Sequence, residues 1–295
     1  CIRTESRMMS RLSTTAPSQP ALDPQVYDSS RRPHPAVEEL QELLRFWHLV
    51  VQWSRRNIKL RYKRSILGVV WTLLEPLMLM TILTVVFSSV FRFDGLDYPF
   101  PLYILPGLLL FDFFNRTTMQ IVDETVASLG LASRIYVPRS AFAVATVLTY
   151  LVNWAIALIP LVAIMMVLRQ PLSWAILTIP FGMLLSSLFA LGVGLLVATL
   201  GAFFHDVKLT YQVLLTGWFY ATPIIYPLEI VPAPFEKYFL LNPLLHLVAL
   251  VREPVIFARV APLENWMAAG GFSLAALALG WWVFTTQRSV FDYRS

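Results

Sequence analysis

Six cationic side chains stand close together in the first third of the chain, at Arg55, Arg56, Lys59, Arg61, Lys63 and Arg64. Residues 69–91 follow this basic cluster directly and are almost wholly apolar. As a helix rising about 1.5 Å per residue, that stretch covers roughly 35 Å, enough to cross a hydrocarbon core of about 30 Å. Because cations beside a span hold that end in the cytoplasm, we predict an integral membrane protein with a cytoplasmic N-terminal part.

The composition agrees with a membrane protein. Hydrophobic residues make up 57% of the chain, charged residues only 14%, and the mean hydropathy is +0.63. Soluble domains carry about 25% charged residues, so this chain lacks the charge to coat a water-facing globule. The net charge of +5 is concentrated beside a span, so we expect anionic lipid headgroups rather than nucleic acid as its partner. The single cysteine, Cys1, leaves no internal disulfide framework.

Motifs for covalent or metal chemistry are missing from the sequence. It contains no G-x-x-x-x-G-K-[ST] phosphate loop, no H-E-x-x-H, no C-x-x-C and no G-x-S-x-G. The four histidines are scattered and are expected to be solvated or packed rather than metal ligands. The sequence therefore offers little for covalent catalysis, and we expect no metal or cofactor to be bound within this chain.

The hydropathy pattern predicts an all-α fold. Residues 1–35 are rich in Ser, Thr, Pro and Arg, which predicts a disordered cytoplasmic tail. Residues 36–66 carry an apolar side chain every three or four positions, typical of an amphipathic helix in the membrane interface. A transmembrane domain, 67–290, follows, with six spans expected at 69–91, 102–122, 141–168, 174–200, 210–226 and 266–286. The proline-rich region 227–262 predicts two short re-entrant helices on the outer side, and an excess of Lys and Arg in the inner segments predicts that both termini are cytoplasmic.

Two spans have unusual contents. The second contains Asp112, Asn115 and Arg116, and polar groups inside a span usually face protein or water rather than lipid. The fourth contains small residues such as Gly192, which predict close helix approach. Glu75, near the start of the first span, is most simply an interfacial carboxylate.

Several motifs then occur in an order that resembles a known family. They are LRYKRSILGVVWTLLEPLMLM, LPGLLLFDFFN, SRIYVPRSAF, WFYATPIIYP and NPLLHLVALVREPV. The chain, over about residues 40–290, is similar to the membrane subunits of ABC-2 type exporters, in the polysaccharide and polyol-phosphate branch. Members of that branch export lipid-linked O-antigen, capsule or teichoic acid. Glu75 departs from the pattern, because Asn is expected there as often as an acid.

This resemblance implies a half-transporter in a bacterial inner membrane. Two copies would form a homodimer, and two separate ABC ATPase subunits would bind ATP and Mg. The segment 36–66 would be the gate helix of the family. Short cytoplasmic segments would couple the permease to the ATPase, with candidates at Arg134, Tyr136, Pro138, Arg139, His205, Asp206 and Lys208.

A lipid-linked glycan carries an anionic pyrophosphate and a long chain of sugars. Under the resemblance, Arg61, Lys63 and Arg64 are the expected partners of the pyrophosphate at the cytoplasmic interface. Sugar rings pack on aromatic rings, and the candidate glycan pathway consists of Phe111, Phe113, Phe114, Tyr150, Trp154, Trp218, Tyr220 and Tyr226. The alternative for each ring is the ordinary interfacial aromatic belt or packing.

Other functions stay open at this point. The chain is also compatible with an ABC-2 exporter of teichoic acid, a lipid or a drug. A membrane-embedded transferase acting on a polyprenyl-linked sugar would need an acidic pair on the cytoplasmic side. Asp123 and Glu124 are the adjacent acidic pair near a span end there, and helix capping explains them equally well.

Overall fold

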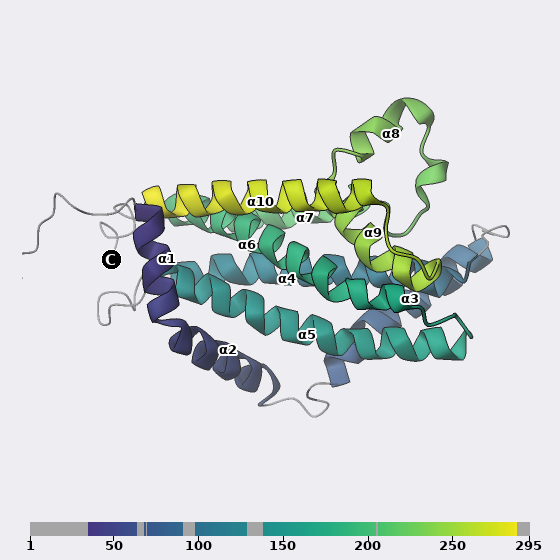
Figure 1. Cartoon of the computed structure of the whole chain (residues 1–295), viewed down its shortest axis with the longest axis horizontal. Helices are drawn as coiled ribbons and strands as arrows, with labels where there is room; N and C mark the ends of the chain where they lie inside the picture. The colour runs from purple at the N-terminus through teal and green to yellow at the C-terminus, as the bar shows by residue number, and fades with distance from the viewer. Residues whose placement is uncertain are drawn as a thin grey trace, which may run out of the picture. The chain divides into compact units, whose positions relative to one another are not determined.

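The computed structural model describes residues 35–63, 68, 70–90, 98–128, 138–204 and 206–287. Every regular element among these residues is helical, which confirms the predicted all-α fold (Figure 1). The α-helices are α1 (Pro35–Arg45), α2 (Trp47–Tyr62), α3 (Val70–Val90), α4 (Phe100–Ser128), α5 (Ser140–Val167), α6 (Ile179–Phe203), α7 (Val207–Ala221), α8 (Ala233–Phe239), α9 (Pro243–Ile256) and α10 (Leu263–Thr286). Two short 3-10 helices join them, η2 (Trp174–Thr178) and η3 (Leu228–Ile230).

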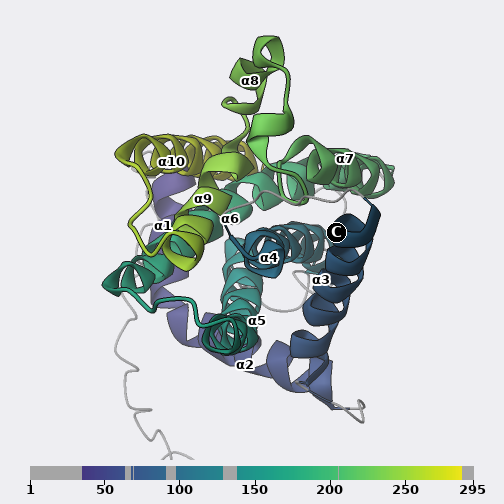
Figure 2. The same ribbon diagram turned by 90° about the vertical axis from the view of Figure 1, so that its right-hand side faces the viewer.

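Helix α4 lies at the centre of the bundle. It contacts α3, α5, α6, α7 and α9, and the end-on view shows these helices around it (Figure 2). Its N-terminal half, FPLYILPGLLLF, is apolar on all sides, which is typical of a helix buried all round. Its fully buried side chains include Leu102, Ile104, Leu105, Leu110 and Phe114. The main core of the protein is therefore built around α4.

Glycines bring α6 and α10 into backbone contact. A Cβ on Gly192 would collide with the backbone of Ala276, and a Cβ on Gly280 would collide with the backbone of Gly192. Without a hydrophobic drive between helices in lipid, such close approach supplies van der Waals contact instead. The predicted role of Gly192 in close packing is confirmed.

Four helices are long and apolar enough to cross a membrane, among the residues that the structure describes. They are Val70–Phe87 of α3, α5, the joined segment Trp174–Phe203, and α10. Helix α4 has 29 residues but carries Asp112 and Arg116 in its middle, and α7 has only 15 residues. The six-span arrangement thus stays a prediction. The proline-rich region contains the short helices α8 and α9, and whether they are re-entrant is likewise untested.

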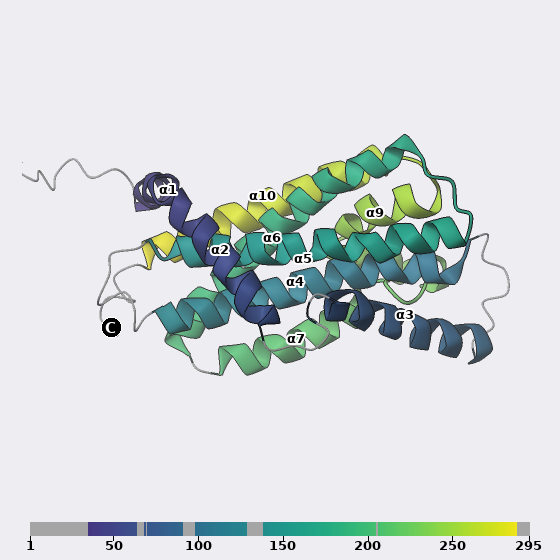
Figure 3. The ribbon, with the colours of Figure 1, turned by 90° about the horizontal axis from the view of Figure 1, so that it is seen from below.

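The predicted amphipathic segment forms two helices rather than one. The chain turns at Phe46, where φ is −95° and ψ is 18°, so α1 and α2 run in different directions (Figure 3). Helix α2 lies across α5, with Val50 and Ser54 buried against it. The apolar stripe on α1, which includes Val37, Leu40 and Leu44, is exposed. That exposed stripe suits a membrane interface, while the opposite side of α1 packs on protein.

One end of the bundle gathers segments from the whole chain. Helix α1 contacts the start of α5 and the end of α10, where the Trp281 Nε1–H donates to the Ala36 carbonyl at 3.0 Å. The end of α4 meets the start of α7 through an ion pair of Asp123 with Lys208. We call this the α1 end. The helices α8 and α9 and the start of α10 lie toward the other end (Figure 1).

Candidate functional site

An ion network joins α3 to the centre of α4. Asp112 and Arg116 are one helical turn apart, and the Arg116 Nε–H donates to Asp112 Oδ1 at 2.6 Å. A second guanidinium nitrogen of Arg116 donates to Glu75 on α3. The side chains are partly exposed, at 32% for Arg116, 50% for Asp112 and 58% for Glu75. Because charged groups facing hydrocarbon are costly, this surface must border water, protein or a polar substrate.

A cavity of about 40 Å³ lies beside the network, between α2, α3, α4 and α5. Besides the three charged residues, its lining includes Arg61 and Tyr150. The Arg61 guanidinium stands 4.9 Å from the centre of the Tyr150 ring, a cation–π contact. We call this space the charged cavity, after its polar lining of Arg61, Glu75, Asp112, Arg116 and Tyr150. Its volume leaves room for little more than water.

A larger cavity of about 440 Å³ shares Arg61 and Tyr150 with the charged cavity. It lies between α2, α4 and α5, and its remaining lining is Asn57, Leu60, Gln120, Glu124, Thr146 and Thr149. Arg61 and Tyr150 therefore border both spaces. This arrangement can bring a polar group along α2 toward the network on α4.

The structure separates the predicted phosphate-binding residues. Arg61 faces Tyr150, whereas Lys63 lines an open groove on another side of α2 together with Gln52, Arg55, Arg56, Lys59 and Leu60. Helical geometry explains this, because two residues turn a helix by about 200°. Arg64 lies outside the described residues. The basic cluster thus has two faces, one toward the bundle and one toward the surroundings.

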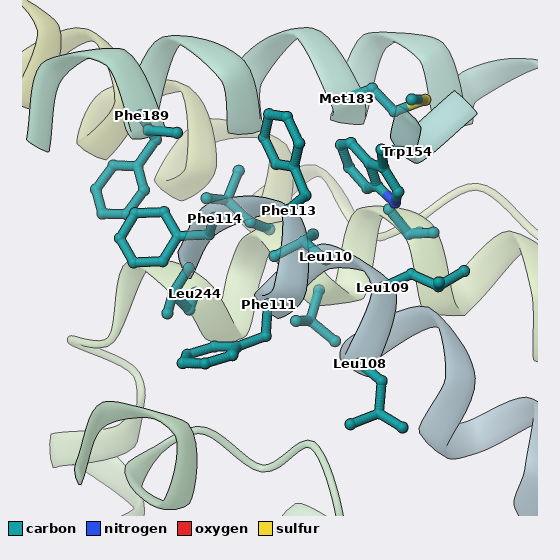
Figure 4. Close-up of a cluster of buried hydrophobic side chains, with 14 of the residues drawn as sticks. Leu108, Leu109, Leu110, Phe111, Phe113, Phe114, Trp154, Met183, Phe189 and Leu244 are labelled. Atoms are coloured by element: carbon teal, nitrogen blue, oxygen red, sulfur yellow. The ribbon is translucent and has the colours of Figure 1, made fainter. Parts of the chain in front are cut away.

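Four of the predicted glycan-pathway rings are buried in the core (Figure 4). Phe111, Phe113, Phe114 and Trp154 are each at most 7% exposed. Phe113 stacks on Trp154 with ring centres 4.8 Å apart, and Phe114 stacks on Phe189 at 5.3 Å. Phe113 and Trp154 also line the charged cavity. The four rings stabilise the packing of α4. Phe113 and Trp154 can in addition present an edge to the charged cavity.

Tyr150 lines the charged cavity, as described above, whereas Trp218, Tyr220 and Tyr226 lie on or after α7, away from that cavity. The Trp218 Nε1–H donates to Asn242 Oδ1 at 2.9 Å, and its ring borders an apolar pocket of about 420 Å³ shared with α8. Tyr220 is 63% exposed, and the Tyr226 hydroxyl donates to the Tyr220 carbonyl at 2.8 Å. Trp218 nevertheless contacts the core rings, because its ring meets the Phe114 ring edge-to-face with centres 5.3 Å apart.

The described coupling candidates lie at the α1 end. Pro138 is buried, Arg139 occupies the N-cap position of α5, and Asp206 is exposed before α7. Lys208 Nζ pairs with Asp123 Oδ1 at 2.6 Å. Arg134, Tyr136 and His205 lie outside the described residues. The structure therefore brings the described residues just before α5 and α7 to the same end of the bundle.

The acidic pair considered for a transferase makes contacts between and within helices. Asp123 is held by Lys208, and Glu124 accepts a hydrogen bond from Gln120 Nε2 at 3.2 Å. Across the described ranges, no three His, Cys, Asp or Glu side chains gather where they could hold a metal ion. These contacts give both carboxylates a structural role.

Three charged residues have roles that sequence reasoning missed. Glu75 binds Arg116 instead of standing alone at an interface. Arg252 on α9 donates hydrogen bonds to the carbonyls of Tyr103, Pro223 and Ile224 at 3.0–3.2 Å, inside the bundle. Glu39 is 2% exposed and contacts α5. Two features of the sequence could have indicated these roles. The i, i+4 spacing of Asp112 and Arg116 is typical of an ion pair within a helix, and Arg252 is the single arginine of the largely apolar α9.

Comparisons with known proteins bear on this geometry. Residues 48–256 match the family described as "ABC-2 type transporter". The chain is 26% identical over 257 residues to the O-antigen export system permease protein RfbA of Myxococcus xanthus, covering 86% of this chain and 98% of that protein. It is 26% identical over 242 residues to the polysialic acid transport protein KpsM of Escherichia coli, covering 79% and 90%. A similar identity, 26% over 207 residues, relates it to the O-antigen export system permease protein RfbA of Klebsiella pneumoniae.

Proposed function

Because the chain belongs to the ABC-2 type transporter family, we propose that it is the permease subunit of an ATP-driven exporter for a lipid-linked polysaccharide such as O-antigen. The relatives named for O-antigen export and polysialic acid transport support this substrate class. In the proposed assembly, two copies of the chain form a homodimer in the bacterial inner membrane. Two separate ABC ATPase subunits bind ATP and Mg, and this chain performs no hydrolysis.

The charged cavity is the observation that carries this proposal. Glu75, Asp112 and Arg116 are partly exposed in the middle of an otherwise apolar bundle. A surface of that kind is stable beside a polar pathway and unstable against lipid tails. Sugar hydroxyls bond to carboxylates and guanidinium groups alike. A hydroxyl-rich chain is therefore a suitable passenger along this face.

The proposed route starts at Arg61. This residue borders both the larger cavity beside α2 and the charged cavity. Its guanidinium can bind pyrophosphate oxygens through charge-assisted hydrogen bonds. The charged cavity is too small for a pyrophosphate, so passage requires α3 to move away from α4. Only 6% of the α3 span is buried, which makes it the easiest of the long helices to displace.

The proposed topology has six spans, which are the four long apolar segments together with α4 and α7. The Trp281–Ala36 hydrogen bond supports an even number of crossings, because it joins the first helix to the end of the last. Helices α8 and α9 then form the re-entrant region at the outer end. Both termini lie in the cytoplasm, where the ATPase subunits dock on the loops before α5 and α7.

Reconstitution tests this proposal directly. The permease and a partner ABC ATPase are placed in proteoliposomes with a polyprenyl-diphosphate glycan, and glycan reaching the opposite leaflet is measured with a lectin. We expect ATP-dependent transfer that fails with an ATPase variant unable to hydrolyse ATP. Preferential transfer of a lipid without glycan would favour the lipid-exporter alternative. Nucleotide hydrolysis by the permease alone would contradict the proposal.

An Arg61 series tests the route. Arg61→Ala should lower glycan transfer about tenfold through the loss of a charge-assisted contact, and Arg61→Lys should lower it less. Arg45→Ala, which removes a charge from the end of α1, serves as the matched control and should leave transfer unchanged. Equal transfer in Arg61→Ala and Arg45→Ala would exclude Arg61 from the route.

A further inference from the structure

A carboxylate from α1 caps the start of α5. Glu39 is 2% exposed, and its Oε1 accepts hydrogen bonds from the Ser140 backbone N–H at 3.1 Å and from the Ser140 hydroxyl at 2.7 Å. Burying a carboxylate is unfavourable unless hydrogen bonds compensate. The unpaired N–H groups and the dipole at a helix start provide that compensation. The contact is therefore a specific feature of the fold.

Helix α5 does not supply this cap locally. Arg139 occupies its N-cap position and makes no side-chain cap hydrogen bond. Helices usually fill the position with Ser, Thr, Asp or Asn, whose side chains bind the first free N–H groups. Here the acceptor comes from a residue 101 positions earlier in the chain. The first turn of α5 is consequently tied to the position of α1.

A small hydrophobic cluster joins α1, α2 and α5. It is separate from the main core around α4, and its buried members are Leu43 of α1, Val50 of α2, and Ala141 and Ala145 of α5. Apolar contact on both sides of the turn at Phe46 holds α1 and α2 on the same stretch of α5. Figure 3 shows α2 crossing α5 with α1 beyond it.

Ring and hydroxyl contacts extend this attachment along α5. The Trp53 ring meets the Phe142 ring edge-to-face with centres 4.8 Å apart. Farther along, the Thr149 hydroxyl donates to Ser54 Oγ at 3.1 Å. The attachment therefore runs over the first half of α5 and not only its first turn.

We propose that Glu39 is a positioning residue that makes α1, α2 and the first half of α5 one mechanical unit. This inference rests on the proposed function, in which the ATPase subunits act at Pro138 and Arg139, directly before α5. Displacement of these two residues is then passed through the Glu39–Ser140 contact to α1 and α2. Arg61, near the end of α2, moves relative to the network on α4, so the hydrolysis cycle reaches the entry of the charged cavity.

The first test compares two neighbouring glutamates. Glu39→Ala should lower glycan export per assembled complex about tenfold, while the ATPase rate stays close to that of the wild type. Glu39→Gln keeps an acceptor and should restore part of the loss. Glu38→Ala, on the same helix, should behave like the wild type. A merely structural role of Glu39 would reduce the amount of assembled complex but leave the ratio of glycan exported to ATP hydrolysed unchanged. An unchanged ratio in Glu39→Ala would therefore overturn the proposal.

Hydrogen exchange on the purified permease provides a readout that does not depend on transport. In Glu39→Ala, the amides of α1, α2 and the first turns of α5 should all exchange faster than in Glu38→Ala. Faster exchange confined to α1 would show that the three helices are not one unit. A wild-type complex that exports no glycan would refute the proposed function, and the exchange comparison would still decide this inference.

A chemical bridge tests the mechanical role. In a Cys1→Ser background, the pair Glu39→Cys and Ser140→Cys is joined by a short bifunctional thiol reagent that a reductant cleaves. We expect weak export before bridging, recovery after it, and no recovery in the Glu39→Cys single variant. Export that falls below the unbridged level in the bridged protein, and returns to that level on reduction, would mean that α1 leaves α5 in each cycle, which overturns the proposal.

Discussion

Helices α6 and α3 are both long and apolar, but they are attached to the bundle in different ways. In an 18-residue apolar window within Trp174–Phe203, which includes most of α6, 67% of the residues are buried, whereas 6% are buried in the α3 window Val70–Phe87. Helix α6 touches α10 backbone to backbone at Gly192, while α3 is tied to α4 by the Glu75–Arg116 ion pair. Length and apolarity therefore do not distinguish a fixed helix from a movable one.

The difference follows from what lipid does to helix association. Apolar side chains gain little by leaving lipid for a protein interior, so tight packing and polar contacts decide which helices stay together. Helix α6 has the small residues for tight packing, and α3 presents large exposed side chains such as Ile82 and Val85. In the proposed homodimer that apolar face of α3 is available to lipid or to the second copy. We infer that α6 and α10 are the scaffold and α3 is the movable wall of the charged cavity.

The strongest way to break this comparison is to force α6 away from α10. In Gly192→Ala the new methyl group would collide with the backbone of Ala276, so we expect a loss of about 2–3 kcal/mol in the free energy of unfolding. Gly270→Ala on α10 is the matched control, because nothing lies within 4 Å of its Cβ position. It should stabilise the helix by up to about 1 kcal/mol. Thermal unfolding in detergent measures both, and equal melting temperatures would contradict the scaffold role.

The second largest effect should come from the ion network. Arg116→Gln removes the cation between Glu75 and Asp112, and we expect export to fall about tenfold with a smaller change in unfolding free energy, about 1 kcal/mol. Arg259→Gln is the control, since it breaks a comparable pair with Glu253, 2.8 Å long, at the end of the bundle opposite the α1 end. Export from proteoliposomes and thermal unfolding together separate the two effects. A drop in stability as large as that of Gly192→Ala would make the network a structural element instead.

Much of the fold could be predicted from the sequence because long apolar runs bounded by prolines and charges leave few alternatives to helices. The all-α class and the close approach at Gly192 are confirmed, and the resemblance to the ABC-2 type transporter family is confirmed over residues 48–256. The turn at Phe46 could not be predicted, since the apolar repeat of residues 36–66 continues through it without a break.

The candidate site was harder to predict because it depends on which helices are neighbours. Asp112 and Arg116 share a helix, but Glu75 joins them only because α3 packs on α4. Glu39 stands among exposed apolar residues of α1, and its burial follows from the position of α5. The different directions of Arg61 and Lys63, in contrast, follow from helical geometry alone, although the sequence prediction groups them. The aromatic run from Phe111 to Phe114 points around the whole helix, so its burial required the surrounding helices.

The smallest effect on stability is expected at the ion pair between Asp123 of α4 and Lys208 of α7. Helix α7, like α3, exposes large apolar side chains, among them Val213, and Lys208 pairs with Asp123 on α4. Both side chains are over 40% exposed at the α1 end, so water screens the pair. Lys208→Ala should therefore change the free energy of unfolding by less than about 1 kcal/mol.

A double-mutant cycle with Asp123→Asn isolates the contribution of this pair to stability. A coupling of a few tenths of a kcal/mol, with export lowered less than in Arg116→Gln, would mean that α7 is held mainly by packing on α4 and α6 and by the buried hydrogen bond from the Tyr211 hydroxyl to Thr118 Oγ1. A coupling above about 1 kcal/mol would instead group α7 with α3, as a second helix whose place in the bundle depends on one ion pair with α4.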